Sequence, residues 1–456
     1  MVTADSPRAP RRALVAWVLF DPACQPFFTL VTTFIFAPYF VSAVVGDPAR
    51  GQALWGYATG AAGLFIALCS PLLGAVADAA GQRKPWIAGF GAMLVLGSAL
   101  LWFAAPGEES RIPLILLAFA IATIGAEFAT VFNNAMMPSL VPPSHMGRLS
   151  GAGWGCGYAG GLISLAIMLV FFSTSPETGL TLLGTPPALG LDAAAREGDR
   201  ISGPFTALWF LLFAAPLFFF VPDTPAKLPL RAAMRVGLKE VSGLFGRLRT
   251  RRNLARFLIA NMVYADGLVA LFAFGGIYAA GTFGWGSLEI GIFGILLTIF
   301  GTVGALVGGR LDDAFGARAV ITGSLAVLFL ASLGILGLDR DSLLFGLVPT
   351  APAQGLFATL PEKIYLGLGI FIGSVAGPLQ AASRSLLVRL APAESIAEYF
   401  GLFALSGKLT SFAAPTLVAI VTTLSGSQKA GVAVLLVFFA LGIMLISGVR
   451  EPGKDG

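Results

Sequence analysis

Charged residues, histidine and cysteine are all scarce in this sequence. Only 12% of the 456 residues are charged, and there are one histidine and three cysteines. A water-soluble protein usually carries about 25% charged residues, so the charge present here is too little to cover a water-facing surface. Cys24, Cys69 and Cys156 lie inside apolar stretches, which does not suit a disulfide framework. With one histidine and no cysteine cluster, we expect no metal site and no cofactor.

Apolar residues fill the gap that charge leaves. Hydrophobic residues make up 56% of the chain, and the mean hydropathy is +0.85. The apolar runs reach the length of about 20 residues that a helix needs to cross a bilayer. The sequence therefore predicts an all-α integral membrane protein with twelve transmembrane helices. The predicted spans are 13–44, 53–77, 85–105, 112–141, 150–173, 204–221, 255–280, 288–311, 319–338, 362–391, 399–425 and 429–449.

The basic residues predict the orientation of these spans. The loops that join odd to even spans hold seven of the 29 Lys and Arg residues, whereas twenty lie on the face that carries both termini. Positive residues favour the cytoplasmic side, so we expect both termini on the cytoplasmic side of a bacterial inner membrane. The net charge of +5 then reflects topology, and no nucleic-acid partner is expected. No small-residue cleavage site follows the N-terminal arginines, so we expect the first span to be retained as a helix rather than removed as a signal peptide.

A basic loop divides the spans into two groups of six. We expect an N-terminal bundle at 1–221, a cytoplasmic linker at 222–254 and a C-terminal bundle at 255–456. Apolar residues recur at helical spacing in the linker, with basic residues on another face. This pattern suits an amphipathic helix on the anionic inner leaflet, and a solvated linker is the alternative. The apolar set is Met234, Leu238, Val241, Leu244, Phe245 and Leu248, and the basic set is Arg231, Arg235 and Lys239.

The two groups of spans repeat each other in sequence. Asp21 in span 1 aligns with Asp266 in span 7, and Gly151 aligns with Gly401. After span 2 stands the pattern Gly74-x-x-x-Asp78-x-x-Gly81-x-Arg83-Lys84. We align it with Gly308-x-x-x-Asp312-x-x-x-Gly316-x-Arg318 after span 8, where the second glycine is shifted by one position. Two six-helix halves in the same orientation form a parallel repeat.

The first of these patterns resembles the signature loop of the major facilitator superfamily. The resemblance implies the twelve-helix fold of that superfamily and a gate at the cytoplasmic side, closed by ion pairs and helix-end contacts. It assigns that gate to Gly74, Asp78, Gly81, Arg83 and Lys84, and to Gly308, Asp312, Gly316 and Arg318 in the second copy. A loop that only fixes the topology is the alternative.

Further stretches resemble one narrower family, that of the autophagy-related vacuolar amino-acid effluxers and their bacterial relatives. The resemblance implies transport of a small solute, with amino acids and export as the expectation. The stretches are Asp21, Asn134-Ala-Met-Met-Pro-Ser, Gly153-Trp-Gly-Cys-Gly-Tyr-Ala-Gly-Gly, Gly377-Pro-Leu-Gln-Ala-Ala-Ser-Arg-Ser and Glu398-Tyr-Phe-Gly-Leu-Phe-Ala-Leu-Ser-Gly-Lys.

Ionisable residues inside the spans are the candidates for chemistry, because a charge within a bilayer usually faces a partner or a water-filled path. They are Asp21, Glu127, Asp266, Arg384 and Lys408, with Gln25, Asn133, Asn134, Asn261, Tyr264 and Gln380 as polar neighbours. We expect the acids to bind substrate or protons and Lys408 to pair with Asp266. The alternative is that each charge only joins helices, and Arg384 lies near enough to the cytoplasmic end to extend to the interface.

The sequence therefore predicts a secondary transporter of a small polar or zwitterionic solute that works by alternating access with proton coupling. We expect a monomer whose partners are membrane lipids, the substrate and protons. A lipid or lysolipid flippase or scramblase on the same fold is the alternative, since lipid headgroups are also zwitterionic. No nucleophile–base pair is evident, so we expect no enzymatic activity.

Overall fold

The computed structural model describes residues 9–175, 178–285, 287–351, 353 and 355–452, and the side chains of a few helical residues, Lys408 among them, lie outside this description. In the described residues, eleven helical segments are long and apolar enough to cross a bilayer, and the helix Ala413–Ser425 is apolar but shorter. The fold is that of an all-α membrane protein, as the sequence predicts. The uninterrupted spans are α4 (Pro48–Ala80), α5 (Lys84–Leu100), α6 (Ile112–Asn134), α7 (Met146–Phe171), α9 (Ser202–Phe220), α11 (Arg252–Phe283), α12 (Ser287–Phe315), α13 (Ala317–Leu336), α14 (Leu360–Leu390) and α17 (Gln428–Ser447).

The first span is built from short pieces because prolines interrupt its hydrogen bonding. Pro26 ends the second piece. One segment of π-helix follows the second piece, and another follows the third piece. The pieces are α1 (Arg11–Val18), α2 (Phe20–Pro26), η1 (Phe27–Phe34), α3 (Phe36–Tyr39) and η2 (Phe40–Val45).

The eleventh span is also interrupted, and here the expectation of one continuous helix was wrong. The span consists of α15 (Ile396–Leu409) and α16 (Ala413–Ser425), with Thr410, Ser411 and Phe412 between them. Pro415 has no amide hydrogen, and its ring would clash with the carbonyl group four residues earlier, at Ser411. The helix therefore stops before this point and starts again.

Smaller elements join the spans. The helical turns η3 (Leu101–Phe103), η4 (Glu109–Arg111), η5 (Met137–Ser139), η6 (Pro143–His145), η7 (Ala188–Gly190), α8 (Glu197–Arg200) and η8 (Ala393–Ser395) lie between spans. The strands β1 (Ser342–Leu343) and β2 (Val348–Pro349) pair antiparallel before α14. Thr359 and Glu362 then start α14 with a reciprocal capping box, in which each side chain accepts from the other residue's amide.

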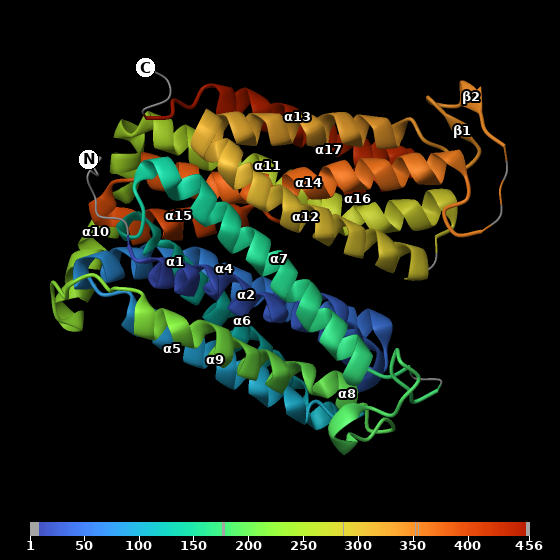
Figure 1. Ribbon diagram of the computed structural model, residues 1–456, viewed down its shortest axis with the longest axis horizontal. Helices are drawn as coiled ribbons and strands as arrows, with labels where there is room; N and C mark the ends of the chain where they lie inside the picture. Colours follow the sequence, from blue (N-terminus) through green and yellow to red (C-terminus); the bar gives the residue numbers. More distant parts are fainter. Residues whose placement is uncertain (1–8, 176–177, 286, 352, 354, 453–456) are drawn as a thin grey trace.

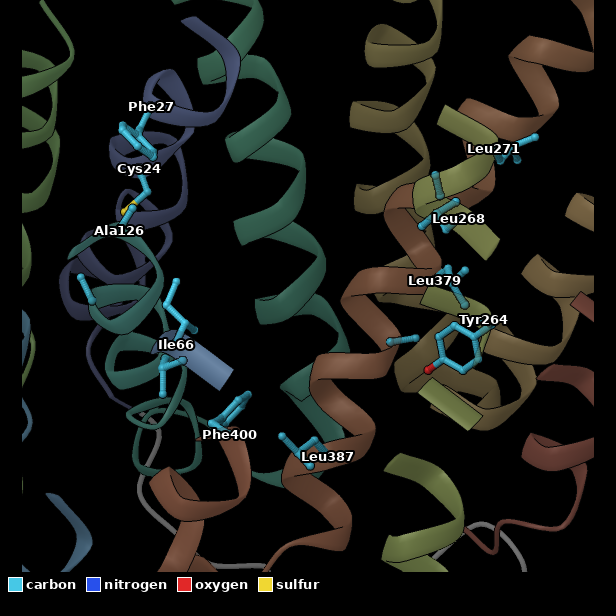
Figure 2. Packing of buried hydrophobic residues seen from close by; sticks show 14 of the residues in the cluster. Cys24, Phe27, Ile66, Ala126, Tyr264, Leu268, Leu271, Leu379, Leu387 and Phe400 are labelled. Atoms are coloured by element: carbon cyan, nitrogen blue, oxygen red, sulfur yellow. The ribbon is translucent and has the colours of Figure 1, made fainter. Parts of the chain in front are cut away.

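The helices form two bundles, which we call the N-half (α1 to α9) and the C-half (α11 to α17). Between the halves, α7 packs on α12 and α14, and α4 packs on α15. Figure 1 shows the halves converging at the end that carries both termini, which we call the terminal end, and diverging toward the far end with α8 and the β1–β2 hairpin. Buried apolar residues run through both halves, and Figure 2 shows Ile66 of α4 near Phe400 of α15.

The helix α10 (Leu230–Thr250) connects the two halves at the terminal end (Figure 1). The sequence predicts an amphipathic helix in this region. One face packs on α4, where Ala233 and Gly237 are buried and a Cβ atom at Gly237 would meet Val76. Leu230, Met234 and Leu238 remain about half exposed on another face.

Candidate functional site

A buried ion pair joins the two halves. Asp21 lies on α2 of the N-half and Arg384 lies on α14 of the C-half. The Nη1 atom of Arg384 is 2.9 Å from Oδ2 of Asp21, and the two side chains are 5% and 12% exposed, respectively. Removing both charges from water is unfavourable unless they neutralise each other with good geometry, so this pair holds the halves in one relative position. Arg384 does not extend to the interface, which was the alternative expectation.

The guanidinium group of Arg384 is also held by its neighbours. Its Nη1 donates to Oδ1 of Asn134 over 3.0 Å, its Nε donates to the hydroxyl of Ser150 over 2.8 Å, and its Nη2 donates to the carbonyl of Ser150 over 2.6 Å. The indole rings of Trp17 and Trp154 lie 5.2 Å and 5.9 Å from the guanidinium carbon, within range of cation–π attraction. All of these partners belong to the N-half, so Arg384 is a C-half residue embedded in the N-half.

Small residues on α7 make this approach possible. A Cβ atom at Gly153 would clash with the Asp21 carboxylate, and one at Gly160 would lie 2.6 Å from Cβ of Pro22. Gln25 packs on Gly161 in the same way. These glycines form a close helix-packing face on α7, and this face positions Asp21 toward Arg384.

The other polar candidates lie in separate places. Gln380 of α14 donates to the hydroxyl of Tyr158 on α7 over 2.8 Å, which is another polar contact between the halves. Tyr264 shares a hydrogen bond of 2.7 Å with Ser383, and Asn261 donates to Ser406 over 3.3 Å, both within the C-half.

Asn133 is fully buried on α6. Its carbonyl accepts from the indole of Trp17 over 2.8 Å, which orders one of the rings beside Arg384. Its side-chain amide has no hydrogen-bond partner among the described residues. The backbone of Asn133 therefore supports the site, whereas its side chain is a buried polar group that no described residue binds.

Asp266 lies on α11, the seventh span, and faces the break between α15 and α16 in the eleventh span. Its side chain is 3% exposed, and its Oδ2 accepts from the amide of Ala414 over 3.3 Å, while its Oδ1 has no hydrogen-bond partner among the described residues. A carboxylate at this position compensates the positive end of α16. The predicted pairing with Lys408 stays a prediction, because the side chain of Lys408 lies outside the described residues. Glu127 is half-buried on α6.

At the terminal end, Asp78 connects α4 of the N-half to α15 of the C-half. Its carboxylate accepts from the amides of Ala397 and Glu398, over 3.2 Å and 2.8 Å, in the first turn of α15. Arg83 donates to the same carboxylate and holds its charge. A Cβ atom at Gly74 would clash with the carbonyl of Ala397, so the glycine lets the two helices touch. We call this contact the first latch.

The second latch corrects the predicted alignment. Asp313, not Asp312, accepts from the first turn of α7, with the amides of Gly147 and Arg148 at 2.8 Å and 3.2 Å. Gly309, not Gly308, meets the facing helix, because a Cβ atom there would lie 2.5 Å from the carbonyl of Gly147. The second copy is therefore Gly309-x-x-x-Asp313-x-x-Gly316-x-Arg318, which keeps the spacing of the first. The double glycine and the double aspartate allowed a register one residue too early.

Asp312 and Gly308 have roles inside the C-half instead. Asp312 is 2.5 Å from Nη1 of Arg389 and accepts from Ser385, both on α14. A Cβ atom at Gly308 would lie 2.5 Å from Cβ of Pro378, also on α14. These residues join α12 to α14, and the side chain of Asp312 also lies against Gly147 of α7, where an added Cβ atom would be 2.6 Å from Cβ of Asp312.

Both latch loops turn at a glycine and start a capped helix. Gly81 and Gly316 each have φ of +93°, which favours glycine. Asp223 then accepts from the amides of Arg83 and Lys84, over 2.8 Å and 3.1 Å. In the C-half, Glu451 accepts from the amides of Ala317 and Arg318, over 3.1 Å and 2.9 Å.

Lys84 and Arg318 also donate through their side chains, to the carbonyl groups of Phe218 and Ser447 at the ends of α9 and α17. Sequence reasoning missed the capping residues Asp223 and Glu451. Each follows the last span of its half and stands next to a proline, which was the available signal. It also missed Ser150, Trp17 and Tyr158, which carry no charge. Among the described residues, no three His, Cys, Asp or Glu side chains gather as a metal site.

Comparison with known proteins decides the family. The family model described as "Vacuole effluxer Atg22 like" matches residues 41–453. The chain belongs to this family. It is 25% identical to the MFS-type transporter YxiO of Bacillus subtilis (strain 168) over 96% of this chain and 94% of that protein. It is 22% identical to autophagy-related protein 22-1 of Aspergillus fumigatus over 68% of this chain, and spans about half of that protein's length (49%).

Solved structures show the same fold. The human organic anion transporter MFSD10 superposes with a TM-score of 0.69 at 18% identity, covering 96% of this chain and 99% of that one. The transporter FucP in its outward conformation also has a TM-score of 0.69, at 16% identity, covering 97% and 99%. This Atg22-like protein therefore has the twelve-helix fold of the major facilitator superfamily and is a membrane transporter by family.

Proposed function

We propose that this Atg22-like protein moves a small zwitterionic solute, of the amino-acid class, across the membrane by alternating access. Residues 1–221 and 255–456 are the two bodies that rock against each other, and residues 222–254 link them. The latches at Asp78 and Asp313 support this proposal, because both tie the halves together at the same end. Opening that end requires both latches to break while the far end closes.

The Asp21–Arg384 ion pair carries the proposal for the substrate. A zwitterion presents a carboxylate that suits the guanidinium group and an ammonium that suits the carboxylate. If the carboxylate of the solute binds Arg384 and its ammonium binds Asp21, the solute breaks the ion pair that joins the halves. Substrate occupancy is then coupled to the relative position of the halves, which is the differential interaction that any ligand-driven change requires.

Export and proton coupling belong to the same proposal. Asp21, Glu127 and Asp266 are carboxylates away from the ends of the predicted spans, and a buried carboxylate is a group that can carry a proton. Asp266 is the strongest candidate, because one of its oxygens has no hydrogen-bond partner among the described residues. The basic loops support placing the terminal end on the cytoplasmic side of the cell membrane. A monomer is sufficient for this function because both halves lie in one chain.

Counterflow in proteoliposomes tests this function. Vesicles loaded with one unlabelled amino acid at a time are diluted into a trace of the labelled compound, and we expect transient accumulation with at least one of them. Arg384→Gln should abolish accumulation, whereas Glu109→Gln, which removes the exposed pair with Arg50 at the far end, should not. A fluorescent-lipid flip assay runs beside it. Lipid movement that depends on Arg384, without counterflow of any amino acid, would replace the solute transporter with a lipid flippase.

A further inference from the structure

The surface of α10 carries three distinct strips around its circumference. Successive residues turn by about 100° in a helix. Ala233 and Gly237 form the strip that is buried on α4. Leu230, Met234 and Leu238 form the next strip, and they are 56%, 50% and 58% exposed. Beyond them lies an exposed basic strip, formed by Arg231, Arg235 and Lys239.

This order around the helix points to one kind of partner. Water contact with a row of apolar side chains is unfavourable, and the described part of the chain does not cover these three. A basic strip directly beside an apolar strip is the arrangement that binds an anionic bilayer surface, with the apolar strip at the acyl boundary and the basic strip at the headgroups. The chain spans a membrane, so such a surface lies beside the terminal end.

The segment before α10 is fixed to the first latch. The amide of Lys227 donates to the carbonyl of Ala80 over 2.8 Å, and its Nζ donates to the carbonyl of Asp78 over 3.4 Å. The hydroxyl of Thr224 donates to the carbonyl of Gly81. The helix that follows is held against α4 at Val76, two residues before Asp78.

We propose that α10 binds the anionic leaflet at the terminal end and thereby stabilises the closed first latch, so that anionic lipid regulates the conformational equilibrium. A bilayer that fixes α10 also fixes the segment 224–227 and the end of α4 that carries Asp78. The same helix also packs on α11 of the C-half, so separating the halves while α10 stays bound requires α10 to leave α4 or α11. The inference assumes the rocking motion of the proposed function, but its test needs no substrate.

Spin labels in nanodiscs test both parts, in protein whose three native cysteines are replaced by alanine. A nitroxide at Leu238→Cys reports depth through its collisions with oxygen and with a water-soluble nickel chelate. Two nitroxides at Ser144→Cys and Glu394→Cys, exposed residues of opposite halves at the terminal end, report the distance between the halves. The nanodiscs contain phosphatidylcholine alone or phosphatidylcholine with phosphatidylglycerol.

With phosphatidylglycerol, we expect the label at 238 to be shielded from the nickel chelate. We also expect the ratio of short to long distances between the labels at 144 and 394 to rise about tenfold, since several basic residues act together. Arg231→Gln with Arg235→Gln should remove this dependence, whereas the matched pair Arg11→Gln with Arg12→Gln, at the same end but on α1, should keep it. Three results would overturn the proposal. They are a label at 238 that nickel reaches in both bilayers, the same distribution of distances between labels 144 and 394 in both bilayers, and an equal loss of the lipid dependence in the two paired variants. None of these results depends on whether an amino acid is transported.

Discussion

Asp78 and Asp313, which stand 235 positions apart, each cap the first turn of a helix in the opposite half. The helices they cap, α15 and α7, receive no side-chain cap from Ser395 or His145 at their own N-cap positions. Two amides at the start of each helix therefore have this carboxylate partner only while the halves touch, so separating the halves exchanges charge-assisted hydrogen bonds for bonds to water.

Asp78→Asn should weaken the closed terminal end. The change removes the negative charge that two amides and Arg83 share, and hydrogen bonds to a charged group contribute about 1.5–3 kcal/mol each. A cysteine at Ser70, which is fully buried in the wild type, should then react with a maleimide about tenfold faster. Asp313→Asn should act similarly, and Asp341→Asn at the far end should not. Unchanged labelling would leave the loop as a topology signal only.

A single added methyl group should separate contact glycines from other glycines. A Cβ atom at Gly401 would clash with the carbonyl of Ser70, and one at Gly151 would clash with that of Ala305. Gly401→Ala and Gly151→Ala should therefore raise the rate at which a maleimide labels the cysteine placed at Ser70. Gly63→Ala is the control, because no atom lies within 4 Å of its added Cβ, and it should stabilise α4 by about 1 kcal/mol or leave it unchanged. Equal effects at all three positions would contradict a contact role.

Breaking the Asp21–Arg384 pair from one side should destabilise the protein. Asp21→Ala leaves Arg384 charged and 4% exposed, which is expected to cost about 3–5 kcal/mol. Thermal unfolding in detergent should show a lower Tm for this variant and recovery of part of the loss in Asp21→Asn with Arg384→Gln. A double variant less stable than Asp21→Ala would argue against a direct pair.

Lys408 and Asp266 are predicted to pair. Lys408→Ala should then leave Asp266 without its cation and lower stability by up to about 3–5 kcal/mol, or leave Asp266 neutral. Combining it with Asp266→Asn should restore folding but not transport, as measured by Tm and counterflow. A double variant no more stable than either single variant would defeat the pairing, and Asp266 would then depend on the amide of Ala414 alone.

Transport should respond to an imposed pH gradient if a carboxylate carries the proton. The gradient should stimulate accumulation in the wild type, and the stimulation should disappear when the proton-carrying acid is neutralised in Asp266→Asn, Glu127→Gln or Asp21→Asn. Glu109→Gln at the far end should keep the response. A wild-type protein that ignores the gradient would remove the basis for proton coupling.

The sequence by itself determined the fold class and the number of spans, and it singled out the stretch that carries Asp78. The length of the hydrophobic runs matches the thickness of the bilayer, and Asp78 stands at fixed spacing from Gly74 and Gly81 in one short stretch of sequence, so both signals are local. Local signals also indicated that charged residues within spans, such as Asp21 and Arg384, require a partner.

Only the tertiary structure decided which partners meet. Asp21 and Arg384 are 363 positions apart, and no periodicity relates them. Adjacent duplicates, Gly308 with Gly309 and Asp312 with Asp313, gave two possible registers, and the direction in which each side chain points on α12 selected one. Pairing across a helix bundle depends on the rotation of each helix about its axis, which packing against its neighbours sets and the spacing of residues along one helix does not.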